Sequence, residues 1–195
     1  MAIEAANLMI NFLTTGEIRH AVNTVAIDPQ MMHKMRGHLN LSHRLGLLLS
    51  GWHTGNVESC HLTLQGEAAK QDSRLLTSAF CAGLIDDVMD EEVNIVNAEV
   101  LLGDRGIKIT TTNEGEKGAF SSSIRAEIET NSGEKRVAAG TLFGNEMPRL
   151  ITLDQYRLES YLDGIMVVFT HNDVCLLYTS PSPRDATLSR MPSSA

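Results

Sequence analysis

A change of hydrophobic period near residue 107 limits the fold of this chain most strongly. Before it, most segments have apolar residues at every third or fourth position, most clearly residues 29–52, PQMMHKMRGHLNLSHRLGLLLSGW, as on one side of an amphipathic helix. After it, GIKITTTN, AFSSSIRAEIET and EKRVAAGTLFG alternate apolar and polar residues, as strands do. The pattern predicts an α+β fold in which a mixed or antiparallel sheet packs with helices.

Cap and turn residues place the expected element boundaries. Asp72 or Ser73 caps a helix in DSRLLTSAFCAGLIDDVM, and Gly106 ends a short helix over residues 97–104. Asn131-Ser132-Gly133 is typical of a hairpin turn between two strands. The sequence therefore predicts two helices, then a strand-rich part, after the long helix.

Two further segments complete the expected fold. Residues 57–68, VESCHLTLQGEA, alternate so that Cys60, Leu62 and Leu64 share the buried face of a strand. Residues 3–13 have helical apolar spacing at the start of the chain. Short strands follow on both sides of the Asp154-Gln155 pair.

Charge and composition exclude several classes of partner. The formal net charge is −8, and without residues 175–195 it is −9, which argues against binding to nucleic acid or acidic membrane surfaces. No apolar run approaches the roughly 20 residues that span a bilayer, and the start lacks the features of a secretory signal. The three cysteines have no metal-site or disulfide spacing, so we expect a reduced, cytoplasmic compartment.

The titratable residues do not suggest a catalytic or metal site. His33, His38 and His43 follow one another at intervals of five, about 500° of helical rotation, so we expect solvated or rim positions rather than a ligand set. Cys60 and Cys81 lie in apolar surroundings in the sequence and are interpreted as small buried side chains. We expect no bound metal.

Other polar residues have equally plain interpretations. The acidic run around residues 86–92 favours a solvated turn over a pair of catalytic carboxylates. His61 on a strand face is most simply a packed or edge residue. His20, in the expected linker, is a candidate for contact with a preceding domain.

The last 21 residues differ in character from the rest of the chain. They hold three of the five prolines and have no apolar periodicity. A disordered tail is the plain interpretation. The stretches CLLYTSPSPRD and SRMPSSA, however, resemble the translation of a transposase-type sequencing-library adapter, with Ala186-Thr187-Leu188 where a variable index would lie. We therefore use no residue of 175–195 in a functional argument.

Three stretches in the body carry a family resemblance. NFLTTGEIRHAVN, VNIVNAEVLLGDRGIKI and GTLFGNEMPRLITLDQYRLESYLDGIMVVFTHNDV resemble the C-terminal part of long-form D-3-phosphoglycerate dehydrogenases. The resemblance implies four parts: residues 1–22 as the last helix and linker of a substrate-binding domain, 23–162 as the intervening regulatory domain, 163–174 as the first strand of a truncated ACT domain, and 175–195 as an artefactual tail.

The resemblance also implies the activity of the parent enzyme. Members of the family oxidise 3-phosphoglycerate to 3-phosphohydroxypyruvate with NAD, the first step of serine biosynthesis, and we expect the parent to be a homo-oligomer. This chain has no G-x-G-x-x-G turn, which would receive the dinucleotide pyrophosphate. We therefore expect a regulatory piece with no catalytic, cofactor-binding or metal-binding residue of its own.

Regulation in this family is attributed to a small anionic effector, which implies a cationic site. Lys108, Lys117 and Arg125 lie in the stretch where the family's cations occur, after the Arg105-Gly106 pair. Clustered cations bind phosphate well, and ordinary surface charge is the alternative.

Two other functions stay open at this stage. The chain is alternatively a stand-alone module that binds a small anion or forms oligomers, with no enzyme activity. A related domain also occurs in iron–sulfur L-serine dehydratases, but the body has only two cysteines, far apart, too few for a cluster.

Overall fold

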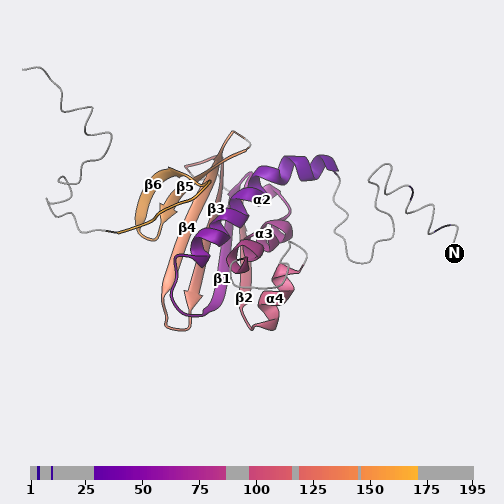
Figure 1. The fold of residues 1–195 in the computed structure, drawn as a ribbon. Helices are drawn as coiled ribbons and strands as arrows, with labels where there is room; N and C mark the ends of the chain where they lie inside the picture. Colours follow the sequence, from indigo (N-terminus) through magenta and orange to yellow (C-terminus); the bar gives the residue numbers. More distant parts are fainter. Residues whose placement is uncertain are drawn as a thin grey trace, which may run out of the picture. The chain divides into compact units, whose positions relative to one another are not determined.

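The computed structural model describes residues 4, 10, 29–86, 97–115, 119–144 and 146–170. The elements are α2 (Pro29–Ser50), β1 (Val57–Gly66), the 3₁₀ turn η1 (Ala68–Lys70), α3 (Ser73–Ile85), α4 (Ala98–Asp104), β2 (Lys108–Glu114), β3 (Ser122–Thr130), β4 (Lys135–Phe143), β5 (Met147–Leu153) and β6 (Tyr156–Tyr161). Figure 1 shows α2 and α3 crossing the same side of the strands. The predicted α+β class is confirmed.

The described strands form one mixed sheet in the order β2-β1-β3-β4-β5-β6. β1 and β2 are parallel, and every other neighbouring pair is antiparallel. A parallel pair needs a long crossover, which here contains η1, α3 and α4. β1 therefore lies between β2 and β3, although β2 comes directly before β3 in the sequence.

The buried face of β1 matches the alternation in its sequence. Cys60, Leu62 and Leu64 are at most 1% exposed, while His61 on the opposite face is half-buried. The helices cover the Cys60 side, since the hydroxyls of Thr77 on α3 and Thr111 on β2 lie 2.7 Å apart. We call the opposite side of the sheet, which carries Ser59, His61 and Gln65, the open face.

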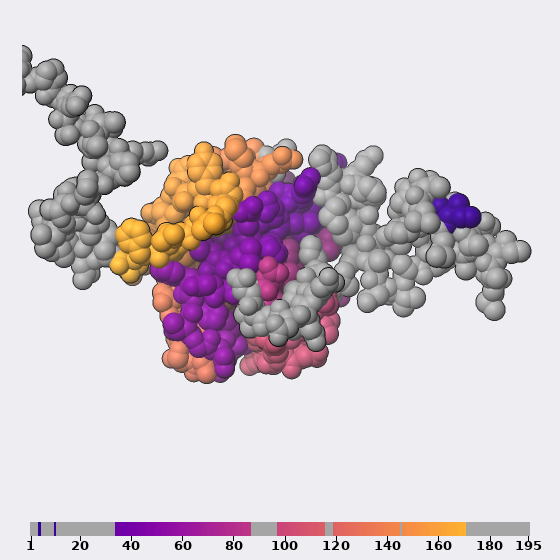
Figure 2. All heavy atoms as spheres, in the orientation of Figure 1, coloured from indigo at the N-terminus to yellow at the C-terminus, as the bar shows by residue number. Residues whose placement is uncertain are grey.

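The buried side of helix α2 differs in part from its apolar stripe in the sequence. Met35, Leu39, Leu45 and Leu49 are buried as expected, and Lys34, Arg36 and Asn40 are exposed; α2 forms part of the surface seen in Figure 2. Leu48 and Trp52, also on the apolar side, are half-buried. Leu41, which fills the space beside Gly140 of β4, takes part in the core instead.

Helices α2 and α3 pack closely because each contributes a glycine at the crossing. A Cβ added to Gly46 would lie 2.2 Å from the Phe80 carbonyl oxygen, and one added to Gly83 would lie 2.0 Å from the His43 carbonyl oxygen. Helix α3 itself is capped by Asp72, whose carboxylate accepts hydrogen bonds from the backbone N–H groups of Arg74 and Leu75. This resolves the choice between two expected caps.

The predicted hairpins are confirmed. β3 and β4 pair on both sides of the Asn131–Gly133 turn, where Gly133 has a φ of 77°. β5 and β6 pair around Asp154, which adopts the left-handed φ of 51°. Asp and Asn tolerate this conformation better than other non-glycine residues.

Two expected segments are not tested by the structure. Apart from residues 4 and 10, the expected helix over 3–13 lies outside the described residues, as does the tail. Residues 163–170, the described part of the expected ACT strand over 163–174, have no regular secondary structure. The ACT assignment stays a prediction.

Candidate functional site

The three cations predicted from the sequence do not form one cluster in the described structure. Lys108 is exposed at the start of β2, paired in register with Ser59, and Arg125 is exposed on β3, paired with Thr63. Ser59 and Thr63 are four residues apart on β1, roughly 13 Å along the strand. Arg125 already binds Glu127 at 2.8 Å. Lys117 lies outside the described residues.

The structure instead presents a cavity of about 410 Å³ at the end of the sheet where β1 begins. Its lining has two nitrogen-rich side chains, one amide and an aliphatic wall: His53, Gly55, Asn56, Val57, Leu84, Ile85, Leu102, Arg105 and Ile107. A volume of this size accepts a small metabolite. The combination of a guanidinium with apolar walls suits a small anion that carries a carbon skeleton.

Backbone geometry holds both polar sides of the cavity. Helix α4 ends with Gly106 at a φ of 77°, and the Ile107 N–H donates to the Leu102 carbonyl at 3.1 Å, a bonding pattern that closes helix C-termini. These bonds hold the backbone at Arg105, whose own N–H donates to the Leu102 carbonyl at 3.1 Å. On the other side, the Asn131 N–H donates to the Asn56 carbonyl at 2.9 Å, which ties the α2–β1 connection to the β3–β4 hairpin.

From the sequence, Arg105 was used only to mark the start of the cationic stretch, and His53 and Asn56 were missed. Both lie in the short stretch His53-Thr54-Gly55-Asn56, which has no periodicity and is typical of a turn. The His53 Nδ1 atom is buried and has no hydrogen-bond partner among the described residues. Only the fold brings this stretch next to the end of α4.

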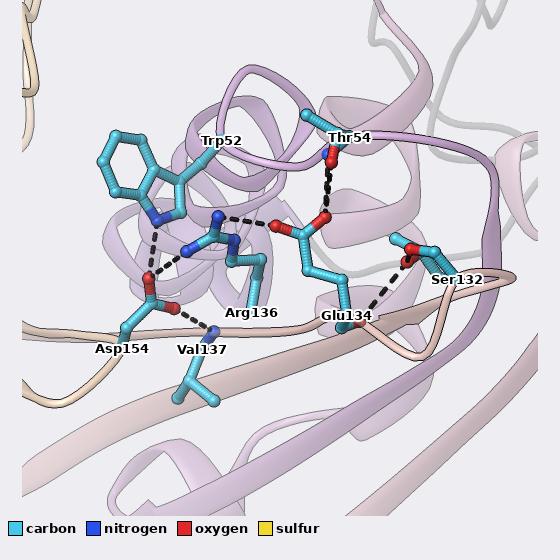
Figure 3. Close-up of polar contacts among 8 residues, drawn as sticks. Trp52, Thr54, Ser132, Glu134, Arg136, Val137 and Asp154 are labelled. Atoms are coloured by element: carbon cyan, nitrogen blue, oxygen red, sulfur yellow. Dashed lines mark hydrogen bonds and ion pairs between the residues drawn. The ribbon is translucent and has the colours of Figure 1, made fainter.

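A second polar cluster, made of Trp52, Glu134, Arg136 and Asp154, lies where α2, the β3–β4 hairpin and the β5–β6 turn meet (Figure 3). The Arg136 guanidinium binds Asp154 Oδ2 at 2.8 Å and Glu134 Oε1 at 2.5 Å. Its carbon centre lies 5.4 Å from the centre of the Trp52 ring. We call this set the Arg136 cluster.

Both carboxylates of the Arg136 cluster accept hydrogen bonds in addition to their ion pairs with Arg136. Asp154 accepts hydrogen bonds from Trp52 Nε1 at 2.8 Å and from the Val137 N–H at 3.0 Å. Burial is the largest single effect on its pKa and raises it, but the hydrogen bonds together lower the pKa below the ordinary value of 3.8.

Glu134 behaves in the same way. It accepts from the Thr54 hydroxyl at 2.7 Å and from the Thr54 N–H at 3.1 Å. These bonds are the main cause of its lowered pKa. Carboxylates held ionised in this way are poor proton donors near neutral pH. The bonds of the Arg136 cluster instead connect three parts of the fold: the end of α2, the β3–β4 hairpin and the β5–β6 turn.

His38 corrects the expectation for the helix histidines. It is 8% exposed, and its Nε2 lies 2.9 Å from the hydroxyl oxygen of Ser122 on β3. Burial lowers its pKa, against a smaller opposing effect of Glu67. His43 is half-buried, and burial lowers its pKa too. The solvated or rim position was therefore wrong for His38, and the side chain of His33 lies outside the described residues.

The interpretations of the cysteines and of His61 are confirmed. Cys60 and Cys81 are buried as free thiols, and burial raises the pKa of Cys60 to about 12. His61 lies at the open face with its Nδ1 2.8 Å from the Thr110 hydroxyl. Within the described part of the chain, no three His, Cys, Asp or Glu residues come together as metal ligands.

Of the acidic run, only Asp86 is described. It is exposed directly after α3. The rest of that run, like His20, lies outside the described residues.

Arg149 is a further cation that the sequence did not single out. Its guanidinium stacks on the Tyr161 ring, with the carbon 3.4 Å from the ring centre, and lies 5.3 Å from the centre of the Phe143 ring. Such stacking holds a cation in a fixed orientation. Register pairs Arg149 with Tyr161 across β5 and β6.

The turn after β1 does not fit a dinucleotide. In a dinucleotide site the glycines leave space for the pyrophosphate. Here a Cβ on Gly66 would lie 2.2 Å from the Ser121 carbonyl oxygen, and the Glu67 N–H donates to the same oxygen at 3.0 Å. The chain's own backbone fills that space, so this turn leaves no room for a pyrophosphate.

Among the described residues no helix is both long and apolar enough to cross a membrane.

Comparisons with known proteins agree with the sequence resemblance. The family model described as the D-3-phosphoglycerate dehydrogenase intervening domain matches residues 34–154. These residues run from α2 to Asp154, and so include the lining of the cavity and the Arg136 cluster.

Individual relatives carry the same name. The chain is 27% identical over 165 residues to a D-3-phosphoglycerate dehydrogenase of Archaeoglobus fulgidus, covering 85% of this chain and 31% of the relative. It is 28% identical over 175 residues to that of Synechocystis, covering 89% and 31%. The human protein of that name is 24% identical over 120 residues, covering 59% and 22%. The chain thus spans about a third of the length of the first two relatives.

Proposed function

The chain belongs to the family of the D-3-phosphoglycerate dehydrogenase intervening domain, and on this basis we propose that it is the regulatory, non-catalytic part of a D-3-phosphoglycerate dehydrogenase. The parent enzyme, in this proposal, is cytoplasmic and oxidises the 2-hydroxyl of 3-phosphoglycerate with NAD as hydride acceptor, for serine biosynthesis. The observation that carries the proposal is the match over residues 34–154.

The geometry supports a non-catalytic role for the described residues. The carboxylates of the Arg136 cluster are held ionised, and both described cysteines are buried with raised pKa values. The turn after β1 is filled by backbone. Hydride transfer needs a bound nicotinamide and a positioned acid–base group, and the parent would supply both from other parts of its chain.

The first experiment measures NADH formation at 340 nm by the purified 195-residue chain with 3-phosphoglycerate and NAD. We expect no NADH above the protein-free control. Formation of NADH that scales with protein concentration would refute the non-catalytic role.

A small-anion effector is the second part of the proposal, and the cavity around Arg105 supports it. Calorimetric titration with 3-phosphoglycerate tests it, with inorganic phosphate as the smaller anion. Arg105→Ala removes the cation of the cavity, while Lys108→Ala and Arg125→Ala remove the described cations that the sequence suggested. Heat that disappears only in Arg105→Ala assigns the effector to the cavity, and heat that disappears in the other two assigns it to the strands.

The alternative function, a stand-alone anion-binding module, rests on the same cavity. A different experimental outcome distinguishes it from the regulatory part of a dehydrogenase. A module without enzyme activity would bind the anion in the isolated chain and would have no effect when joined to a dehydrogenase. Absence of binding at millimolar 3-phosphoglycerate and phosphate would remove both the effector and this alternative.

A further inference from the structure

Among the described strands, β2 lies at one edge of the sheet. β2 is the first strand of the sheet order and pairs only with β1 among the described strands. Its seven residues pair in unbroken register, from Ser59 with Lys108 to Gln65 with Glu114. Half of the backbone N–H and C=O groups of such a strand point away from its neighbour.

The middle of β2 contains no residue or irregularity that disrupts pairing at an edge. Natural edges are protected by proline, by bulges, by charged side chains, by short strand length or by a covering helix or loop. The sequence Lys-Ile-Thr-Thr-Thr-Asn-Glu has charges only at its two ends, and the register of β2 has no bulge. By contrast, β6 at the other edge pairs irregularly with β5, with a shift between Leu150 and Thr152.

The two end charges of β2 are complementary under a two-fold axis. If two copies of β2 pair antiparallel about Thr111, Lys108 of each copy lies opposite Glu114 of the other. Lys108 and Glu114 pair in register with Ser59 and Gln65, so both side chains lie at the open face and meet on the same side of the joined sheet. Within the described residues Lys108 forms no ion pair, and Glu114 accepts one hydrogen bond, from Gln65 at 2.6 Å.

The rest of the strand fits the same arrangement. Thr110 would lie opposite Thr112 of the second copy, and Ile109 opposite Asn113. Threonine pairs and opposite charges stabilise antiparallel neighbours, each by a small amount. A self-complementary patch of this kind produces a closed dimer.

We propose that the outer edge of β2 is a homodimer interface, in which two copies of this chain join their sheets antiparallel about Thr111. The contact consists of main-chain hydrogen bonds with one ion pair at each end. A seam of seven residues is at the small end of specific interfaces, so the dimer dissociates in the micromolar range. The proposal does not depend on dehydrogenase activity, and its tests do not use it.

Reversing the charge of Lys108 or Glu114 tests the ion pairs at the two ends of the interface. Sedimentation velocity from about 1 to about 200 µM protein should give a monomer–dimer equilibrium. Lys108→Glu and Glu114→Lys each place like charges opposite one another at both ends of the seam. Each should weaken the dimer by roughly 10- to 50-fold, and the double variant should restore it.

Lys135→Glu is the matched control for net charge. Lys135 is 72% exposed at the start of β4, away from β2, so this variant should dimerise like the unchanged chain. A chain that stays monomeric at every concentration overturns the proposal. So does a dimer that neither single exchange weakens.

A crosslink tests the register independently of the charges. In a Cys175→Ser background the only native thiols are the buried Cys60 and Cys81. Thr111→Cys would place two cysteines directly opposite, about 5 Å apart between Cα atoms, which a disulfide can join. Asn113→Cys would place them more than roughly 12 Å apart. Mild oxidation should link the first variant and not the second, and equal linking or no linking of both contradicts the register.

Discussion

The crossing of α2 and α3 gives the sharpest stability prediction. Gly83 lies inside α3, and a Cβ there would be 2.0 Å from the His43 carbonyl oxygen and 3.0 Å from the Leu47 backbone nitrogen. Both are main-chain atoms of α2, so no side-chain rotation relieves the clash. In Gly83→Ala the two helices must separate by more than about 1 Å to restore van der Waals contact.

Two opposing effects set the magnitude. Alanine favours the helix over glycine by about 1 kcal/mol, whereas overpacking in a close-packed core costs about 1–3 kcal/mol and sometimes more. The clash involves backbone on both sides, so we take the high end and expect Gly83→Ala to lower the free energy of unfolding by about 2 kcal/mol. The Tm should fall by roughly 4–8 °C.

Urea unfolding followed by circular dichroism measures this change, and Gly103→Ala is the matched control. Gly103 also lies in a helix, but a Cβ there has no atom within 4 Å, so only the helix preference remains. Gly103→Ala should raise the free energy of unfolding by up to about 1 kcal/mol. If Gly83→Ala is as stable as Gly103→Ala, the close crossing of the two helices is refuted.

Three further predictions follow from the buried polar groups. Asp154→Ala leaves the bonds from Trp52 and Arg136 unmade and places alanine at a left-handed φ, so chemical unfolding should show a loss of about 2–4 kcal/mol, with Asp154→Asn in between. Burial lowers the pKa of His38, so its neutral ring stabilises the fold above pH 6.5, the unfolded value, and this contribution is lost as the pH falls through the lowered pKa. The free energy of unfolding should therefore decline less from pH 8 to pH 5 in His38→Gln than in the unchanged chain. In Cys175→Ser, Cys60 and Cys81 are the remaining thiols and both are buried, so a thiol reagent at pH 8 should react in urea but not with the folded protein. Rapid labelling without urea would contradict their burial.

The secondary structure was predictable because burial follows the repeat of each element. Cys60, Leu62 and Leu64 are buried at intervals of two on β1, as the sequence alternation requires. The buried position of His38 was not predictable in that way, because its partner Ser122 lies 84 residues away. The glycines at the helix crossing also gave no signal, since glycine inside a helix is by itself only unfavourable.

The candidate site was harder to predict than the fold, for a topological reason. Lys108 and Arg125 are close in sequence, but β1 lies between their strands. The cavity brings together His53, in the connection between α2 and β1, and Arg105, directly after α4. The approach of these two residues depends on the parallel crossover from β1 to β2. The hydrophobic period and the turn residues of the sequence do not specify that crossover.

The most direct test of the proposed role joins this domain to a working enzyme. Residues 34–154 would replace the matching segment of the Archaeoglobus fulgidus D-3-phosphoglycerate dehydrogenase, and NADH formation would be measured against 3-phosphoglycerate concentration, with and without Arg105→Ala in the graft. The account predicts a folded chimera that produces NADH, with a concentration dependence that Arg105→Ala alters. A chimera that folds and assembles like the parent but produces no NADH, or whose concentration dependence is the same with and without Arg105, would contradict it.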